Sequence, residues 1–356
     1  MTTKPRGALA AILLAALLLP SCLSTARAQE EQTPAAAGAA QERDHGIGLY
    51  QRGDIKAAIK VLRAAVKLDK NDGEAWHFLG LALHRDGEVK EARKAVERAV
   101  KLRPDFVPSR SGLAYLLLLS NKQREALREA EAALALDPKN SEAHYIASVV
   151  RLRQDAPARA LEEIQAALAA TPDFAAALLW KSEVLLALYV QKTGHVEGES
   201  PQARAERNGR ALDLLKQAAE SLERYLQLNP SLSREDVWRE QLETLRVFAR
   251  SPKEGGSDNS TVLTMGEVTT KARVLTRAEP QYTEEARKNR VGGTVVLRAV
   301  FAADGTVKNI LVLRSLPHGL TEAAVQAARG ITFVPATKDG RPVSQFIQIE
   351  YNFHIN

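Results

Sequence analysis

Regular spacing of prolines and alanines constrains this chain more than any other feature of its sequence. Prolines recur at one step, at Pro104, Pro138 and Pro172. Two series of alanines keep the same step: Ala58, Ala92, Ala126 and Ala160, and Ala65, Ala99, Ala133 and Ala167. Small residues also align at Gly46, Gly80, Ala114 and Ser148. A period of about 34 residues predicts a solenoid, because one repeat cannot bury its own apolar face and several must stack.

The most regular repeat runs from residue 73 to 106 and indicates two antiparallel helices. Its landmark residues are Trp76, Leu79, Gly80, Ala92, Ala99 and Pro104. The small residues permit close helix contacts, and Asp86 and Gly87 supply the turn. Pro104 ends the second helix because it has no N–H to donate. The pattern resembles the tetratricopeptide repeat family, which implies an α-solenoid of helix-turn-helix repeats.

We expect the solenoid to span residues 42–250, with about five repeats and a capping helix. Lys70 replaces the proline of the first repeat, and a polar stretch at 191–208 interrupts the fifth. Ser233 and Asp236 are expected as a capping pair for a last helix that ends near residue 250. We interpret this helix as the polar end cap of the array.

The first helix of each repeat predicts a binding surface, because tetratricopeptide arrays bind peptides on the concave face that these helices line. In the repeat register the groove surface comprises His77, Leu81, His84, Arg85, Tyr115, Leu118, Tyr145, Val149 and Arg153. Aromatic side chains interleaved with arginines suit a peptide partner. The alternative is an ordinary solvated solenoid surface, and one sequence does not separate the two.

Residues 1–28 are typical of a secretory signal peptide. Lys4 and Arg6 precede an unbroken apolar run at 8–19, and Ala28 completes a small-x-small cleavage site. The apolar run is too short for a comfortable bilayer span, although an uncleaved anchor stays an alternative. Residues 29–41 are polar and Ala-rich, and we expect a disordered tether there.

Cys22 is the only cysteine of the chain. With Leu19, Pro20 and Ser21 it resembles a bacterial lipobox, although Pro20 departs from the usual small or branched residue. Lipidation at Cys22 would tether the protein to the outer membrane, whereas cleavage after Ala28 would release a cysteine-free chain into the periplasm. Both remain open, and neither leaves thiol chemistry or disulfides in the folded part.

The last part of the chain changes from a helical to an alternating period. Residues 251–261 predict a linker, and residues 262–356 predict a small α+β domain. Within residues 294–301 the apolar side chains Val295, Leu297, Ala299 and Phe301 share one face. Asp304 and Gly305 then predict a hairpin to a strand at 306–314.

A short helix and a long strand are predicted after this hairpin. The helix spans residues 321–329, with Thr321 as its cap and Gly330 as its end. The strand spans residues 343–355, where apolar and polar side chains alternate. A strand of this kind has one face on a core and the other in water.

The motifs of this region resemble the TonB C-terminal family. They are Pro280, Tyr282, Ala286 and Arg287; Gly293 and Val295; Asp304 and Gly305; Ala323 and Ala324; Phe333, Pro335 and Ala336; and residues 340–343. Thr283 stands where the family usually has proline, which weakens the opening turn. The resemblance implies a TonB C-terminal-like domain with an antiparallel sheet.

The same resemblance implies binding by strand addition, in which main-chain hydrogen bonds give affinity and alternate side chains give specificity. The presented edge strand would consist of Gln345, Phe346, Ile347, Gln348, Ile349, Glu350, Tyr351, Asn352 and Phe353. The implied partner is a periplasmic peptide of a TonB-dependent outer-membrane transporter. The alternative is an edge that is covered or paired with a second copy of the domain.

No motif for catalysis, a cofactor or a metal occurs in the sequence. It contains no H-E-x-x-H, no cysteine pair, no G-x-S-x-G and no phosphate-binding glycine loop. The net charge of +6 falls to +3 once Lys4, Arg6 and Arg27 leave with the signal peptide. We therefore expect neither an enzyme nor a nucleic-acid-binding protein.

These features together predict an exported adaptor with two protein-binding surfaces, in which membrane contact occurs only through an N-terminal lipid or anchor. One alternative is a TonB-type energy transducer for transmembrane transport, which requires an uncleaved N-terminus. Residues 8–19 lack the polar residue that motor coupling needs within a membrane span. Another alternative is a cell-envelope assembly scaffold whose C-terminal domain self-associates.

Overall fold

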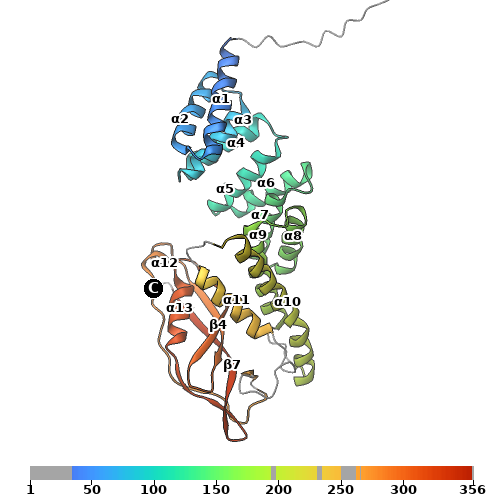
Figure 1. The fold of residues 1–356 in the computed structure, drawn as a ribbon, viewed down its shortest axis with the longest axis vertical. Coiled ribbons are helices and arrows are strands. Elements are labelled where there is room, and N and C mark those ends of the chain that lie inside the picture. Colours follow the sequence, from blue (N-terminus) through green and yellow to red (C-terminus); the bar gives the residue numbers. More distant parts are fainter. Residues whose placement is uncertain (1–33, 194–197, 231–234, 250–261, 265, 355–356) are drawn as a thin grey trace, which may run out of the picture.

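The computed structural model describes residues 34–354 except 194–197, 231–234, 250–261 and 265. A stack of helices leads from α1 to a sheet-containing C-terminal domain, here called the head, which lies at the far end of the stack (Figure 1). The expected signal peptide, Cys22, Ser233 and the linker at 251–261 lie outside the described residues.

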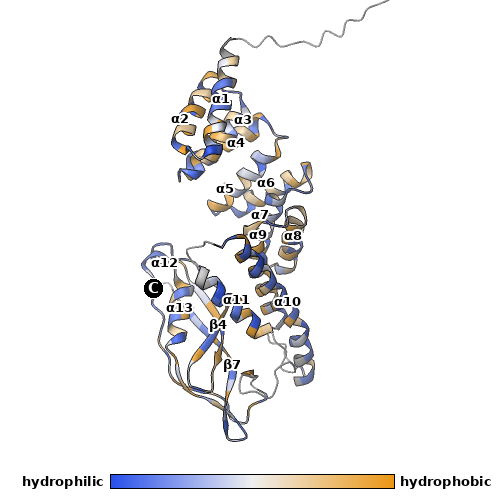
Figure 2. Ribbon diagram, in the orientation of Figure 1, coloured by the Kyte–Doolittle hydropathy of each residue, from blue (hydrophilic) through white to orange (hydrophobic). Residues whose placement is uncertain are grey.

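The solenoid is built from the first eleven helices of the described chain, in which α1 to α10 form five antiparallel pairs and α11 packs on α10. They are α1 (Pro34–Arg52), α2 (Ile55–Leu68), α3 (Gly73–Arg85), α4 (Val89–Leu102), α5 (Val107–Leu119), α6 (Gln123–Leu136), α7 (Ser141–Arg153), α8 (Pro157–Ala170), α9 (Ala175–Thr193), α10 (Pro201–Leu228) and α11 (Glu235–Ala249). Helices α2 to α8 each carry both hydrophobic and hydrophilic residues (Figure 2). The α-solenoid expected from the repeat period is confirmed.

The turn inside each of the first four repeats uses a left-handed residue at the same repeat position. Gly53, Gly87, Asn121 and Asp155 have φ of +87°, +88°, +56° and +58°. Glycine adopts this conformation without strain, and Asn and Asp tolerate it better than other residues do. A φ above zero therefore recurs once in each of these repeats, although the residue type changes.

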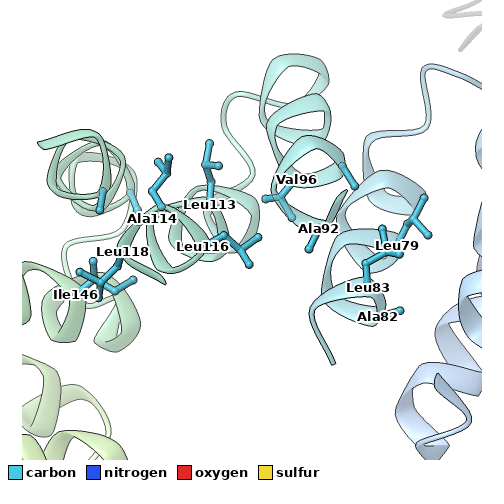
Figure 3. Packing of buried hydrophobic residues seen from close by; sticks show 14 of the residues in the cluster. Leu79, Ala82, Leu83, Ala92, Val96, Leu113, Ala114, Leu116, Leu118 and Ile146 are labelled. Carbon is cyan, nitrogen blue, oxygen red and sulfur yellow. The ribbon is translucent and has the colours of Figure 1, made fainter. Parts of the chain in front are cut away.

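The core of the solenoid is built from small and branched residues of consecutive helices (Figure 3). Gly80 of α3 lies against α4, where a Cβ atom would come within 2.3 Å of Val96 Cγ2. Gly46 of α1 lies equally close to α2, where an added Cβ atom would come within 2.6 Å of Leu62 Cγ. The aligned small residues therefore mark the closest approach of the two helices in these repeats.

Two boundaries of the solenoid differ from expectation. Helix α1 begins at Pro34, so the stretch 34–41 of the expected tether is helical. The expected polar interruption at 191–208 is shorter, because α9 runs to Thr193 and α10 begins at Pro201. The side chain of Ser200 caps α10 by accepting a hydrogen bond from Ala203 N at 3.1 Å. Polar residues after Pro201 thus extend a helix instead of forming a loop.

The head contains a mixed sheet, two helices and a separate two-stranded ribbon. Its elements are β1 (Val262–Leu263), β2 (Arg273–Thr276), α12 (Glu284–Lys288), β3 (Gly293–Phe301), β4 (Val307–Arg314), α13 (Leu320–Arg329), β5 (Thr332–Val334), β6 (Ala336–Lys338) and β7 (Arg341–Phe353). The main sheet has the order β1-β7-β3-β4. Strand β1 is parallel to β7, and the other pairs are antiparallel.

One face of this sheet packs on α13 and forms the core of the head. Val295, Leu297, Ala299 and Phe301 of β3 all lie in this core, as the alternation predicted. Phe301 stacks on Phe333 with ring centroids 4.1 Å apart. The expected cap of α13 was wrong, because Gly319 with φ +78° precedes the helix and Thr321 Oγ1 instead bonds the main chain of Leu316. Gly330 ends α13 as expected.

The opposite face of the sheet packs against the solenoid. Leu245 and Phe248 of α11 share a buried cluster with Val300 of β3 and Leu311 of β4. Helix α11 is therefore not a polar cap facing water, because its apolar side covers the sheet. Among the described residues, no helix is long and apolar enough to cross a membrane.

Candidate functional site

The predicted groove surface lies on three consecutive first helices, α3, α5 and α7. Arg85, Tyr115 and Arg153 are exposed, and Leu81, His84 and Tyr145 are half-buried. His77, Leu118 and Val149 are buried, so these three side chains belong to the core and not to a binding surface. The His77 ring contacts Ser109 Oγ at 3.1 Å and lies edge-on to Phe106.

The remaining groove residues form a continuous line across neighbouring repeats. The His84 ring lies edge-on to Tyr115 with 5.4 Å between centroids. Desolvation raises the pKa of Tyr145, and the nearby Tyr115 raises it further while Arg153 lowers it. The structure thus brings His84, Tyr115, Tyr145 and Arg153 together along one side of the array.

Sequence reasoning missed Tyr50 of α1, which extends this line into the first repeat. The Arg85 guanidinium lies 4.6 Å from the centroid of the Tyr50 ring. Tyr50 occupies the repeat position of His84, one repeat earlier, so the register could have revealed it. Cation–π contacts of this kind hold a guanidinium in place without neutralising its charge.

The groove surface carries unpaired polar groups. Among the described residues, no carboxylate lies within 4.0 Å of Arg85 or Arg153. The Nδ1 atom of His84 is buried and has no hydrogen-bond partner within the described chain. Unpaired guanidinium groups are free to bind carboxylate or carbonyl oxygens of a partner, for which their fork geometry is well suited.

The second candidate surface is the outer edge of β7, on the side away from β3. At its start this edge is covered, because Leu263 of β1 pairs with Gln345. The expected edge strand is therefore wrong at Gln345, whose side chain is fully buried. From Phe346 to Phe353, no other described strand pairs with β7 on this side. We call this main-chain stretch the edge surface.

The side chains of β7 alternate as predicted. Ile349, Tyr351 and Phe353 are buried in the core, while Gln348, Glu350 and Asn352 are exposed. Phe346 instead faces α11, where it contacts Phe248. A strand added to this edge would therefore meet the polar side chains of Gln348, Glu350 and Asn352.

Arg277 reaches the edge surface from the chain segment that follows β2. Its guanidinium donates a hydrogen bond to the main-chain oxygen of Glu350 and lies 4.3 Å from the Tyr351 ring centroid. The Glu350 oxygen thus points away from β3, and in an antiparallel pair the N–H of the same residue points the same way. Main-chain groups of alternate residues around Glu350 are consequently directed outward.

Two buried polar atoms beside this edge have no partner within the described chain: Gln345 Nε2 and Tyr351 Oη. The main-chain N–H of Ala272 satisfies only the oxygen of the Gln345 amide, at 2.8 Å. Burial raises the pKa of the Tyr351 hydroxyl, and the Arg277 guanidinium opposes this shift. Among the described residues, no three His, Cys, Asp or Glu side chains gather as a metal site would require.

Two protein families match the chain over these regions. The tetratricopeptide repeat family matches residues 43–105 and 112–173. The C-terminal domain of the Gram-negative bacterial TonB protein matches residues 278–355. The chain contains tetratricopeptide repeats followed by a TonB C-terminal-like domain. Both domains are protein-interaction modules, and neither match indicates an enzyme family. The TonB C-terminal domain suggests a protein of the Gram-negative cell envelope.

Solved structures of other repeat proteins are similar to the solenoid. A crystal structure of MamA is 18% identical, covers 55% of this chain and 97% of that chain, and gives a TM-score of 0.41. PilF of Pseudomonas aeruginosa is 18% identical, with 58% and 99% covered and a TM-score of 0.40. YrrB, described as a TPR protein with an unusual peptide-binding site, is 16% identical, with 56% and 91% covered and a TM-score of 0.37. No curated protein matches the chain.

Proposed function

We propose that this protein is an exported periplasmic adaptor that holds two partners at once. The groove surface binds a peptide segment of one partner. The edge surface accepts a strand of the other, a periplasmic peptide of a TonB-dependent outer-membrane transporter. The observation that carries this proposal is the outer edge of β7 from Phe346 to Phe353, with which no other described strand pairs and where the outward Glu350 oxygen accepts a hydrogen bond from the Arg277 side chain.

Strand addition at this edge predicts that binding depends on the main-chain groups of β7 more than on its side chains, because main-chain hydrogen bonds provide the affinity. Replacing Glu350 with proline removes one outward N–H and leaves the ladder with β3 intact, since proline is tolerated on the free side of an edge strand. Replacing Glu350 with alanine removes the side chain and keeps the N–H. The two variants therefore separate main-chain from side-chain recognition at one position.

The probes are synthetic peptides that copy the periplasmic N-terminal segments of the TonB-dependent transporters encoded by the same bacterium. Binding is measured by calorimetry, and the bound strand is located by backbone NMR shifts. We expect Glu350→Ala to bind at least one such peptide and Glu350→Pro to lose most of the affinity. Equal binding by both variants, or shifts confined to the solenoid, would exclude strand addition at β7.

The groove proposal rests on the line from Tyr50 to Arg153 and on the two guanidinium groups without carboxylate partners. We infer that its ligand is an extended peptide with acidic residues, because each free guanidinium favours a carboxylate. Arg85 and Arg153 occupy the same repeat position two repeats apart. Charge reversal at both residues should abolish capture of an acidic partner, whereas reversal at the exposed Lys216 of α10 should not.

Export is tested independently by mass spectrometry of the N-terminus from native envelope fractions. A chain that begins at Gln29 or at lipidated Cys22 supports the adaptor. An intact N-terminus in the inner membrane would instead support an energy transducer with an uncleaved anchor. Stable dimers that disappear in Glu350→Pro would favour the self-associating scaffold.

A further inference from the structure

Exposed apolar side chains gather on the ribbon formed by β2 and β5. Seven large hydrophobic residues of the described chain are substantially exposed, and three of them lie on this ribbon. They are Val274 at 44%, Leu275 at 53% and Val334 at 43% of their full exposure. The other four are distributed over α2, α5 and α6. Val334 lies opposite Arg273 in the ribbon, whereas Val274 lies opposite the buried Phe333. Isolated exposed apolar residues are ordinary, but several on one short element indicate an interaction site.

The chain segments that contain and adjoin the ribbon, residues 269–277 and 332–341, carry the entire net charge of the head. Residues 262–356 contain 12 Lys and Arg against 8 Asp and Glu. Five of these cations flank the ribbon: Lys271, Arg273, Arg277, Lys338 and Arg341. Only Asp339 opposes them within 269–277 and 332–341, so the rest of the head holds seven charges of each sign.

These five cations lie outside the ion pairs of the head. In the described part of the chain, none of the five has a carboxylate within 4.0 Å, whereas other arginines of the head, such as Arg287 and Arg329, form ion pairs. Arg277 contacts a main-chain oxygen and a tyrosine ring, which leaves its charge uncompensated. Positive potential is therefore concentrated beside the apolar group.

The ribbon that carries the exposed apolar residues is anchored to the core of the head. Among the described strands β2 pairs with β5 alone, and every residue of β2 is exposed. Phe333, in the middle of β5, is buried in the head core and stacks on Phe301. Thr276 and Thr332 bond each other across the strands at 2.6 Å. The exposed side chains therefore stand on an anchored ribbon and not on a loose loop.

We propose that the β2–β5 ribbon docks the head onto an anionic lipid surface. Lipid phosphates would pair with Arg273 and its neighbouring cations, and Leu275 and Val334 would enter the apolar boundary below the headgroups. An anionic lipid surface offers negative phosphates and an apolar layer directly below them. The ribbon has basic and apolar side chains that match these two layers. This contact is separate from the N-terminal lipid or anchor and from the groove surface, and it adjoins the edge surface at Arg277.

Vesicle binding tests the proposal on the chain from Gln29 onward, which omits the apolar segment 8–19. The probes are vesicles of phosphatidylglycerol with phosphatidylethanolamine, and vesicles of phosphatidylcholine alone. We expect the protein to sediment with the anionic vesicles only, and we expect added salt to reduce the bound fraction. Arg273→Gln should weaken binding about fivefold, since each basic residue near an anionic surface contributes about that factor. Leu275→Ser should weaken it as well.

Matched controls lie on the solenoid, where Leu136 is similarly exposed at 48% and Lys216 lies on α10. Leu136→Ser and Lys216→Gln should bind like the parent chain. Because this shortened chain has no cysteine, Leu275→Cys and Leu136→Cys each accept one environment-sensitive dye. The dye at residue 275 should shift to the blue on anionic vesicles, and the dye at 136 should not.

Three results would overturn the proposal. The first is that the protein does not bind anionic vesicles, and the second is that it binds both vesicle types equally. The third is that Arg273→Gln loses binding while Leu275→Ser binds like the parent chain and the dye at residue 275 does not shift. The last result would identify a purely electrostatic site for an acidic macromolecule. None of them bears on strand addition at β7, which the peptide experiment tests separately.

Discussion

The rings of Phe248 in α11 and Phe346 in β7 lie with their centroids 4.7 Å apart, and they join the solenoid to the head. The Arg298 guanidinium of β3 lies over both rings, 5.5 Å from Phe248 and 5.2 Å from Phe346. The same guanidinium donates a hydrogen bond to the Tyr189 hydroxyl of α9. The face of the sheet opposite α13 is therefore used for contact within the chain, and the two candidate surfaces keep a fixed relation.

Replacing Phe248 with alanine should release the head from α11. Phe248 is buried, and truncation of a buried phenylalanine costs about 3–5 kcal/mol. In calorimetry we expect the head to unfold in a separate transition below that of the solenoid. Leu119→Ala, at an exposed site of α5, should leave the profile unchanged. A Phe248→Ala protein with the parent profile would mean that this interface contributes little.

Gly80→Ala should destabilise the solenoid even though alanine favours helix. The new Cβ would lie 2.3 Å from Val96 Cγ2 and 3.1 Å from the Ala92 oxygen, and overpacking of this kind costs about 1–3 kcal/mol. Better helix propensity offsets up to about 1 kcal/mol of that cost.

Gly209 of α10 provides the matched control, because a Cβ there meets nothing within 4 Å. Gly209→Ala should raise the free energy of unfolding by about 1 kcal/mol in urea titrations. If both substitutions stabilise the protein, the close approach of α3 and α4 is not as tight as described.

The repeat fold was predictable because its cause is local and periodic. Gly80, Ala92 and Pro104 act within one repeat, and the same requirement returns in the next repeat at the same position. The docking of α11 on the head was not predictable, since it depends on Phe248 meeting Phe346 from a distant part of the chain. A buried apolar stripe on α11 looks the same in sequence whether it faces another repeat or a sheet.

Buried His77 should make the solenoid less stable in mild acid. Burial, with a smaller effect of Arg103, lowers the pKa of His77 from 6.5 to about 4. The unfolded chain therefore binds the proton more readily, so the full stability is present above pH 6.5 and is lost as the pH falls toward 4. The total loss from this group is about 3 kcal/mol.

The measurement is the free energy of unfolding of the parent chain and of His77→Gln between pH 7 and 4. The carboxylates titrate alike in both proteins, so the difference between the two curves isolates His77. We expect the parent curve to fall more steeply in this range. Parallel curves would show that His77 is protonated with an ordinary pKa in the folded state.

The candidate sites were only partly predictable, for a physical reason. Repeat register identified the helix face of His84, Tyr115 and Arg153, but it did not show that His77 bonds Ser109 inside the core. Alternation identified the outward residues of β7, but only the fold shows that β1 covers Gln345. Exposure depends on neighbours that are distant in sequence.

Site-specific photo-crosslinking in cells tests the two-partner account most directly. A photoreactive residue replaces Tyr115 on the groove surface, Gln348 on the edge surface, or Lys216 on α10 as a control. The account predicts one set of protein adducts at position 115, a different set containing an outer-membrane transporter at position 348, and none at position 216. The two-partner account would be contradicted if neither position 115 nor position 348 gave adducts, or if all three positions gave the same adducts.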